Sequence, residues 1–452
     1  MNTSFSNLIR ELRKAWILFR PAIGMFVSLA LFLAAVTIFL IIIYPDWLRT
    51  EWVLLLVIPA FVTILGVVNN ILQIFEKAFD SIKLTQKIHN ACRRVTNNAL
   101  GVLKPKPRGI PEIIVREETE PIFDLVKKNG AVLFTGEAGV GKSGIACALV
   151  SDVDTKGFFP LLIDARRLAG IVNPYGLRSF FDLDEPVVDA VRRISEDMPV
   201  FIVADQIDNI AGTQSCKVLT DFLADSLDIE NVYVVAISRY KEANEKGAIR
   251  PLLDAGFVMF TCSSVGEELT RHVLAQLGLQ EIPSSLFDLV DNLLNLDIIC
   301  EIIRTSASLN IDDIQNKIDL WERYRTTLIE REDCDNNNGH DFISEAVRLA
   351  RIGLMSADRG FEIDIPPTQI QIRLSSGNII SQISGRKYQF RHDVLQDYLY
   401  AWFACERNFM PKDVRNEIGD LHERNTILWM RDIYQQKNVA EYESFLEDAL
   451  DG

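Results

Sequence analysis

The chain has 452 residues and a formal charge of −15, with 24% charged residues. This length is too great for one ordinary core, so several domains are expected. The charge is uneven: residues 1–110 carry 13 Lys and Arg against 5 Asp and Glu, or +8, and residues 111–452 carry −23. An acidic body argues against general binding of nucleic acid, because it repels phosphate. Seven cysteines without a CxxC pair and five histidines without ligand spacing indicate a reducing compartment, with no disulfide framework or zinc site.

Two long uncharged apolar segments follow a basic N-terminus, and they predict membrane spans at about 22–43 and 52–72. Twenty-two helical residues are about 33 Å long, enough for a hydrocarbon core of about 30 Å. The short link between the segments predicts a transmembrane helical hairpin within residues 1–75. A signal peptide lacks support because Tyr44-Pro45-Asp46 offers no small residues for cleavage, and both runs are long for a buried core helix. Basic flanks predict a two-pass protein of the plasma (inner) membrane, with both termini and the body in the cytoplasm.

Five further regions are predicted beyond the hairpin. Residues 76–111 read as a juxtamembrane helix and a proline-rich linker. The rest divides into a P-loop nucleotide-binding domain (112–262), a helical domain (263–338), a winged-helix domain (339–408) and a helical acidic tail (409–452). No repeat of 20–50 residues is visible.

The segment 131–143 combines an apolar strand, a glycine-rich turn and the start of a helix, with the spacing of a phosphate-binding P-loop. Glycines let backbone N–H groups converge on phosphate oxygens, the lysine reaches the β- and γ-phosphates, and the serine hydroxyl ligates Mg²⁺. A chance glycine-rich turn is the alternative. The predicted cofactors are ATP or ADP and Mg²⁺, and the sequence leaves ATP and GTP unresolved. The predicted nucleotide-binding residues are Gly136, Glu137, Ala138, Gly139, Val140, Gly141, Lys142 and Ser143, with Ser143 also a metal ligand.

From 113 to 260 apolar runs alternate with helical stretches, which predicts an α/β P-loop NTPase fold with a five-stranded parallel sheet. The predicted strands are 131–135, 160–164, 199–204, 232–237 and 256–260. Asp205 ends the third strand, where a buried acid is costly unless a cation faces it, so it is predicted to contact Mg²⁺; a helix N-cap is the alternative. Asp208 is predicted to orient or deprotonate a water. Arg239 follows the fourth strand and is predicted to approach the γ-phosphate, the alternative being a surface arginine.

Residues 262–335 read as helical, and an apolar stripe is predicted on one helix, at Ile311, Ile314, Ile318, Trp321 and Leu328. The polar stretch 333–340 predicts a loop and a domain boundary. Residues 341–408 then show a helix, a strand, a short helix and a hairpin, the order of a winged helix. Its short helix carries a single cation, Arg373, which argues against DNA binding.

Three stretches together resemble the STAND class of signal-transduction NTPases, close to its NACHT branch. They are 136–143, then 202–209 with 236–239, and 388–401, which is similar to the Phe-x-His-x-x-x-Gln-Glu-Tyr/Phe segment that ends the family's winged helix. The resemblance covers about 112–405. It implies that His392 contacts the β-phosphate of ADP and, more weakly, that Arg116 lines the adenine pocket. Without the resemblance, His392 reads as an ordinary core or surface histidine.

The chain departs from this family at two positions. The family usually has glycine where Gln206 stands and an acid where Asn209 stands. The water-activating role then falls on Asp208 alone, which fits a slow ATP hydrolase. The family also carries a long C-terminal sensor, and about 47 residues follow the winged helix here. Sensing is therefore expected either in a separate sensor or trigger protein or through the tail as a docking site.

The resemblance implies a membrane-anchored ATP/ADP switch that oligomerises on activation and acts on the lipid bilayer through its hairpin, in antiviral defence or cell death. Two other functions stay open. One is a membrane-tethered AAA+-like remodelling ATPase, with rapid turnover and constitutive hexamers. The other is a non-catalytic, nucleotide-stabilised membrane scaffold. A DNA-binding membrane regulator ranks below both.

Overall fold

The computed structural model describes residues 52–103, 117–239, 250–262, 264–279, 282–305, 313–336, 339–356, 358–377, 379–419, 422–437 and 439–451. The chain divides into two compact units, Met1–Asn90 and Ala91–Gly452. The first predicted span lies outside the described residues, whereas the second is helical, as part of helix α2 (Trp52–Leu103). Across the described residues, no helix is both long and apolar enough to cross a bilayer. The transmembrane hairpin therefore stays a prediction.

The second unit contains the predicted five-stranded parallel sheet, with strand order β2-β3-β4-β1-β5. Every residue of the first three strands in the chain is buried, which explains their uninterrupted apolar sequence. The predicted five-stranded parallel sheet is confirmed. The strands are β1 (Ala131–Thr135), β2 (Phe159–Asp164), β3 (Val200–Asp205), β4 (Val232–Ser238) and β5 (Val258–Thr261).

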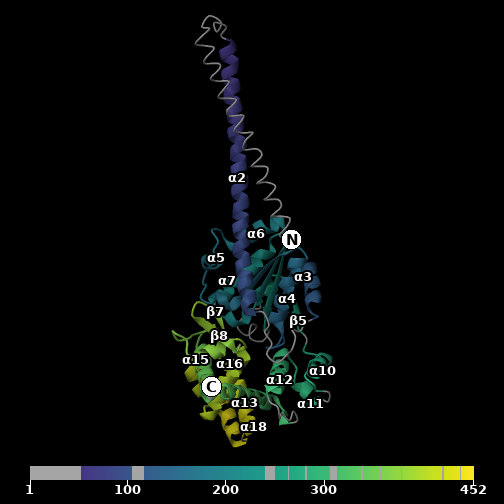
Figure 1. Cartoon of the computed structure of the whole chain (residues 1–452), viewed down its shortest axis with the longest axis vertical. Coiled ribbons are helices and arrows are strands. Elements are labelled where there is room, and N and C mark those ends of the chain that lie inside the picture. The colour runs from purple at the N-terminus through teal and green to yellow at the C-terminus, as the bar shows by residue number, and fades with distance from the viewer. Residues whose placement is uncertain are drawn as a thin grey trace. The chain divides into compact units, whose positions relative to one another are not determined.

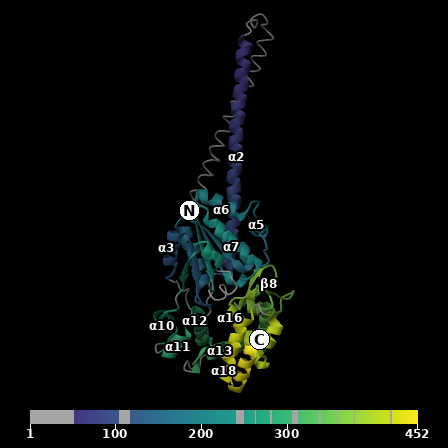
Figure 2. The same cartoon turned by 180° about the vertical axis from the view of Figure 1, so that it is seen from behind.

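Helices cover both faces of this sheet (Figures 1 and 2). Alternate strand residues such as Val132 and Phe134 pack against Ile122 and Ile145 of the helices on one face, and the residues between them point to the other face. This two-sided cover is what a parallel sheet requires. The helices are α3 (Thr119–Asn129), α4 (Lys142–Thr155), α5 (Pro174–Phe181), α6 (Val187–Asp197), α7 (Gln214–Leu227) and α9 (Arg250–Asp254).

The end of α2 covers the edge strand β2. The Thr96 hydroxyl donates to the carbonyl of Pro160 at 3.2 Å and accepts from the N–H of Leu162 at 3.1 Å. Arg94 donates to the carbonyl of Phe181 and to the carboxylate of Asp182, each at 3.1 Å. A side chain thus satisfies edge groups that a neighbouring strand would otherwise pair.

Four helices follow the sheet: α10 (Glu267–Gln276), α11 (Ser284–Leu289), α12 (Leu293–Thr305) and α13 (Lys317–Asn336). Two predictions fail here. Ile314 is buried but precedes α13, so the apolar stripe does not lie on a single helix. The predicted loop 333–340 is also wrong, because α13 continues to Asn336 and the next helix begins at Gly339. The polar residues at the end of α13 show no apolar periodicity, so their sequence resembles a loop.

The winged-helix order is present, with a three-stranded antiparallel sheet in the order β6-β8-β7. The short helix is capped by Thr368, whose hydroxyl accepts from the N–H of Gln371. The elements are α14 (Gly339–Leu354), β6 (Phe361–Glu362), α15 (Gln369–Ser376), β7 (Ile380–Ser384), β8 (Lys387–Phe390) and α16 (Asp393–Glu406).

The C-terminal residues form α17 (Pro411–Ile418), α18 (Glu423–Lys437) and α19 (Val439–Asp451). These helices share one hydrophobic core with the helical and winged-helix regions. At its centre the ring of Trp429 lies 5.4 Å from that of Trp321 and 5.3 Å from that of Tyr398. The residues after the winged helix are therefore part of the fold's core.

Candidate functional site

The P-loop joins β1 to α4 at the carboxyl end of the sheet. Gly139 and Gly141 have φ values of 83° and 100°, a region that residues with a Cβ rarely adopt. A Cβ at Gly139 would lie 2.8 Å from Oδ1 of Asn292, and one at Gly141 would lie 2.8 Å from a methyl of Leu293. The loop thus needs glycine for its backbone and for its close contact with the start of α12.

Lys142 begins α4 and lies in the loop. Its Nζ donates to the carbonyls of Gly136 and Glu137, each at 2.7 Å. Burial lowers the pKa of Lys142, and the negative charge of Asp208 opposes this shift. The ammonium group is therefore held at the mouth of the loop, where the phosphates of a nucleotide would lie.

Asp205 and Ser143 offer a place for Mg²⁺. The carboxylate of Asp205 is buried, and its Oδ2 has no hydrogen-bond partner among the residues that the structure describes. Burial raises its pKa to about 6, and the Ser143 hydroxyl opposes this. An orphaned oxygen beside a hydroxyl fits Mg²⁺, which takes its other ligands from water and phosphate. No group of three or more His, Cys, Asp or Glu that could hold a metal exists in the described parts of the chain.

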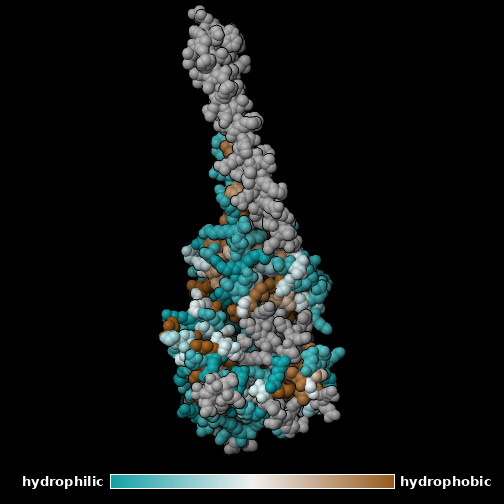
Figure 3. All heavy atoms as spheres, viewed as in Figure 1, coloured by the Kyte–Doolittle hydropathy of each residue, from teal (hydrophilic) through white to brown (hydrophobic). Residues whose placement is uncertain are grey.

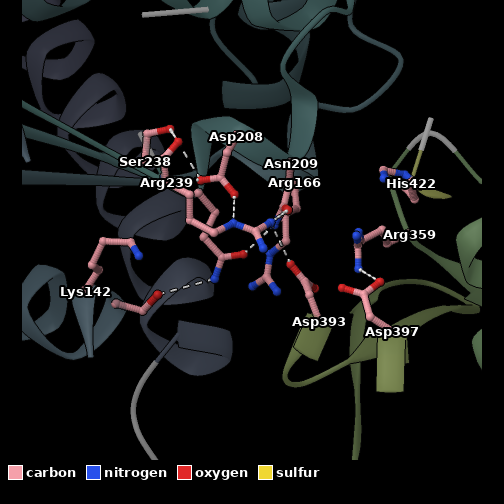
Figure 4. A network of polar contacts seen from close by, with 12 residues as sticks. Lys142, Arg166, Asp208, Asn209, Ser238, Arg239, Arg359, Asp393, Asp397 and His422 are labelled. Atoms are coloured by element: carbon pink, nitrogen blue, oxygen red, sulfur yellow. Dashed lines mark hydrogen bonds and ion pairs between the residues drawn. The ribbon is translucent and has the colours of Figure 1, made fainter. Parts of the chain in front are cut away.

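Asp208 is bound by Arg239 rather than exposed to solvent (Figure 4). The Arg239 Nε donates to Oδ2 of Asp208 at 2.6 Å, and the Arg239 backbone N–H donates to Oδ1 at 3.0 Å. Burial alone would raise the pKa of Asp208, but the positive charges of Arg239 and Lys142 outweigh it and lower the pKa. In this arrangement the carboxylate is a weak base.

Arg239 also reaches the winged helix. Its Nη2 lies 3.3 Å from Oδ2 of Asp393, the first residue of α16, although 154 positions separate the two residues. Burial would raise the pKa of Asp393, but Arg359, Arg239 and Arg166 together lower it. One guanidinium therefore joins a carboxylate of the sheet domain to a carboxylate of the winged helix.

The resemblance alone predicts two further site residues, and the structure describes only one of them. His392 is the N-cap residue of α16, directly before Asp393. Its position beside Asp393 keeps it close to the contact with Arg239. Arg116 lies outside the described residues, so its role in the adenine pocket stays a prediction.

The structure adds two buried ion pairs that sequence reasoning missed. Asp164 ends β2 and binds Arg166 through Nε and Nη2, both at 2.9 Å. Arg359 donates to Oδ1 of Asp397 at 2.9 Å, within the winged helix. The first pair had a signal, since Asp164 ends a buried strand as Asp205 does. The second pair joins residues 38 positions apart without a local pattern.

The short helix of the winged helix does not present its cation. Arg373 is paired with Glu332 at 3.3 Å, and its side chain is 20% exposed. The neighbouring Ile372 and the preceding Ile365 are exposed instead. Hydrophobic surface is visible in Figure 3 over the part of the molecule where Figure 1 places α15 and β8. The one cation of α15 is therefore held in an ion pair with Glu332 instead of facing solvent.

The sheet order and the P-loop between β1 and α4 give this chain a P-loop NTPase fold. No protein-family model matches the sequence, and no curated protein matches it either.

The chain resembles several solved structures at low similarity. A STAND ATPase with a tetratricopeptide-repeat sensor from Pyrococcus horikoshii is 15% identical with a TM-score of 0.35, covering 76% of this chain and 49% of the other. This chain thus spans about half the length of that protein. DnaA from Aquifex aeolicus, bound to AMPPCP, is 11% identical with a TM-score of 0.30, covering 72% and 90%. ORC1 from Aeropyrum pernix, in complex with DNA, is 13% identical with a TM-score of 0.34, covering 68% and 96%.

Proposed function

We propose that this chain is a nucleotide-controlled switch of the STAND type, NACHT-like, whose closed state is held by Arg239. The observation that carries the proposal is the position of this one side chain. It binds Asp208, beside the P-loop, and Asp393, at the start of the winged helix. A change at the phosphate site can therefore act on the winged helix through Arg239.

The switch follows from competition for one guanidinium. Arginine binds phosphate oxygens as well as carboxylates. A γ-phosphate that reaches Arg239 draws it away from Asp393, whereas ADP leaves that contact in place. ATP then shifts the population toward an open winged helix, by its difference in affinity for the two states. His392, next to Asp393, would contact the β-phosphate of ADP in the closed state.

Hydrolysis in such a switch is slow. Asp208 is the proposed water-orienting residue, but its lowered pKa makes it a poor proton acceptor while Arg239 is bound. Mg²⁺, held by Ser143 and Asp205, would neutralise charge on the phosphates. Such a site would retain its bound nucleotide and hydrolyse ATP slowly.

The output proposed for the switch is at the membrane. Residues 22–43 and 52–72 anchor the chain in the plasma (inner) membrane, with the body in the cytoplasm. Opening of the winged helix, triggered by a separate sensor protein, lets the bodies form a homo-oligomer and gathers their hairpins in the lipid bilayer. Perturbation of that bilayer would serve antiviral defence or cell death. Crosslinking with ATP in place of ADP, trigger present, checks this step, and a size that never changes would exclude it.

The test of the switch itself is the nucleotide content of protein purified in mild detergent. Near-stoichiometric ADP is expected in the wild type and none in Lys142→Ala, because Lys142 supplies the charge at the mouth of the loop. An empty site with brisk ATP turnover would refute the switch and favour the AAA+-like remodelling ATPase.

The scaffold alternative predicts a different pair of results. A non-catalytic scaffold needs nucleotide for stability but no chemistry at Asp208. Asp208→Asn would then have no phenotype, whereas Lys142→Ala would remain damaging. Under the switch proposal Asp208→Asn weakens the hold on Arg239 and changes the closed state.

A further inference from the structure

Gln206 connects the P-loop to Asn209. Its backbone has φ 62° and ψ 40°, a left-handed conformation next to the buried Asp205. The Gln206 Nε2 donates to the hydroxyl of Ser143 at 3.3 Å. Its Oε1 accepts from Nδ2 of Asn209 at 2.8 Å. The side chain thus touches the hydroxyl that is proposed to ligate Mg²⁺.

Asn209 continues the connection to the winged helix. Its Oδ1 accepts from Nη2 of Arg239 at 3.1 Å, and the same Nη2 donates to Asp393 at 3.3 Å. Asn209 is 6% exposed and Arg239 is 9% exposed, so water competes little for these bonds. Four hydrogen bonds therefore run without interruption from Ser143 to Asp393.

In this series of hydrogen bonds, which group donates and which accepts in one bond fixes the donor and the acceptor in the next. A carboxamide has one donating end and one accepting end. Because Asn209 donates to Gln206, the Gln206 amide must turn its donor toward Ser143 and the Asn209 amide must turn its acceptor toward Arg239. Rotation of the Asn209 amide by half a turn breaks two bonds at once, and rotation of the Gln206 amide breaks the bond to Asn209, so the bonds are linked through Asn209.

A cation at Ser143 acts directly on the first of these bonds. The positive end of the Gln206 N–H dipole points at the oxygen that the metal would bind, so the metal repels it. The amide gains by presenting Oε1 to the metal or its water shell. That rotation removes the acceptor from Asn209, which loosens the hold of Asn209 on Arg239.

We propose that Gln206 and Asn209 are positioning residues that couple a metal-bound nucleotide at Ser143 to the contact between Arg239 and Asp393. This proposal rests on the proposed nucleotide switch. Both residues stand where the sequence departs from the resembled family pattern, so the coupling is a property of this chain. Because coupling is reciprocal, opening the winged helix must raise the affinity for Mg²⁺ by the same factor by which Mg²⁺ favours opening.

The experiment is a double-mutant cycle read out as Mg²⁺ affinity of the ADP-bound full chain in detergent, by calorimetry. In the wild-type background, Asp393→Asn is expected to raise Mg²⁺ affinity about fivefold or more, the usual size of such coupling. In the Gln206→Gly background the same substitution is expected to have no effect. Glycine accepts the left-handed backbone, so this background should fold. Asn209→Asp, which places an acceptor against Oε1 of Gln206, should also abolish the effect.

The control is Asp397→Asn, one turn further along α16, which disturbs a buried pair with Arg359 and not the bond to Arg239. It should leave Mg²⁺ affinity unchanged. An equal gain from Asp393→Asn in the wild-type and Gln206→Gly backgrounds, or no gain in either, overturns the coupling while ADP binding upholds the nucleotide site. Failure of ADP to bind the wild type would overturn the switch and this coupling with it.

Discussion

Replacing Asp393 by Asn tests the contact that is proposed to hold the switch closed. The substitution keeps the shape of the side chain and removes its charge. The amide oxygen of Asn can still accept, so what is lost is the ionic part of a charge-assisted bond that is 3.3 Å long, with the side chains of Arg239 and Asp393 11% and 18% exposed. Such bonds contribute about 1.5–3 kcal/mol, and the length and partial exposure place this one near about 1.5 kcal/mol. Because about 1.4 kcal/mol changes an equilibrium constant tenfold, the equilibrium constant for closing should fall by a factor of about ten.

Hydrogen–deuterium exchange of the first turn of α16, with ADP bound, measures this loss. Protection at residues 393–397 should fall in Asp393→Asn, and ADP should dissociate faster. Asp397→Asn is the matched control, because it disturbs the pair with Arg359 inside the winged helix and leaves the bond from Arg239 to Asp393 in place. Unchanged protection and ADP dissociation in Asp393→Asn, at unchanged thermal stability, would refute the reasoning. So would an equal opening in Asp397→Asn.

Three more predictions concern the loop, the tail and pH. Gly139→Ala places a Cβ 2.8 Å from Asn292 at a φ of 83°. The free energy of unfolding should fall by about 1–3 kcal/mol, and an unchanged Tm would contradict this. Trp429→Ala should lower the free energy of unfolding, measured in urea, by about 3–5 kcal/mol. A decrease below about 1 kcal/mol would show that the tail is not part of the core. The pKa values of Asp208 and Asp393 are lowered in the folded protein. Their contribution to its stability is therefore complete above the usual carboxyl pKa of about 3.9 and is lost only as the pH falls below that value. Titration of these two carboxylates should therefore not weaken the protection of α16 between about pH 8 and 5. Asp205, whose pKa is about 6, titrates in that range, so the test uses Asp205→Asn, and opening of this variant between about pH 8 and 5 would contradict the assignment.

The sequence was sufficient for features that local patterns define. Uninterrupted apolar runs predict buried parallel strands, and all five strands lie within two residues of their expected bounds. The prediction of burial is wrong for β5, an edge strand in which Val258 and Met259 are exposed. The glycine spacing predicts the P-loop, and the left-handed backbone at Gly139 and Gly141 explains why those positions require glycine. Where the pattern is weak the prediction fails, as at the end of α13, whose polar residues resemble a loop.

The contact between the domains could not be predicted in the same way. Arg239 and Asp393 are 154 positions apart, and each has an acceptable local reading, as a surface arginine or as an acid in the first turn of a helix. Asp208 likewise reads as a catalytic acid until its partner is known. The pairing depends on how the winged helix packs, which no periodicity in the chain encodes.

Gln206 shows how a departure from a pattern can be tested for function. A residue with a Cβ in the left-handed region costs about 1–2 kcal/mol relative to the right-handed one. Its two side-chain hydrogen bonds, to Ser143 and Asn209, offset this by about 0.5–1.5 kcal/mol each. Gln206→Gly removes the strain and the bonds together, so the free energy of unfolding should fall by no more than about 2 kcal/mol. Urea unfolding measures that change. A variant of nearly wild-type stability that has lost its Mg²⁺ response would separate coupling from structural support, whereas a loss of several kcal/mol would assign Gln206 to the fold.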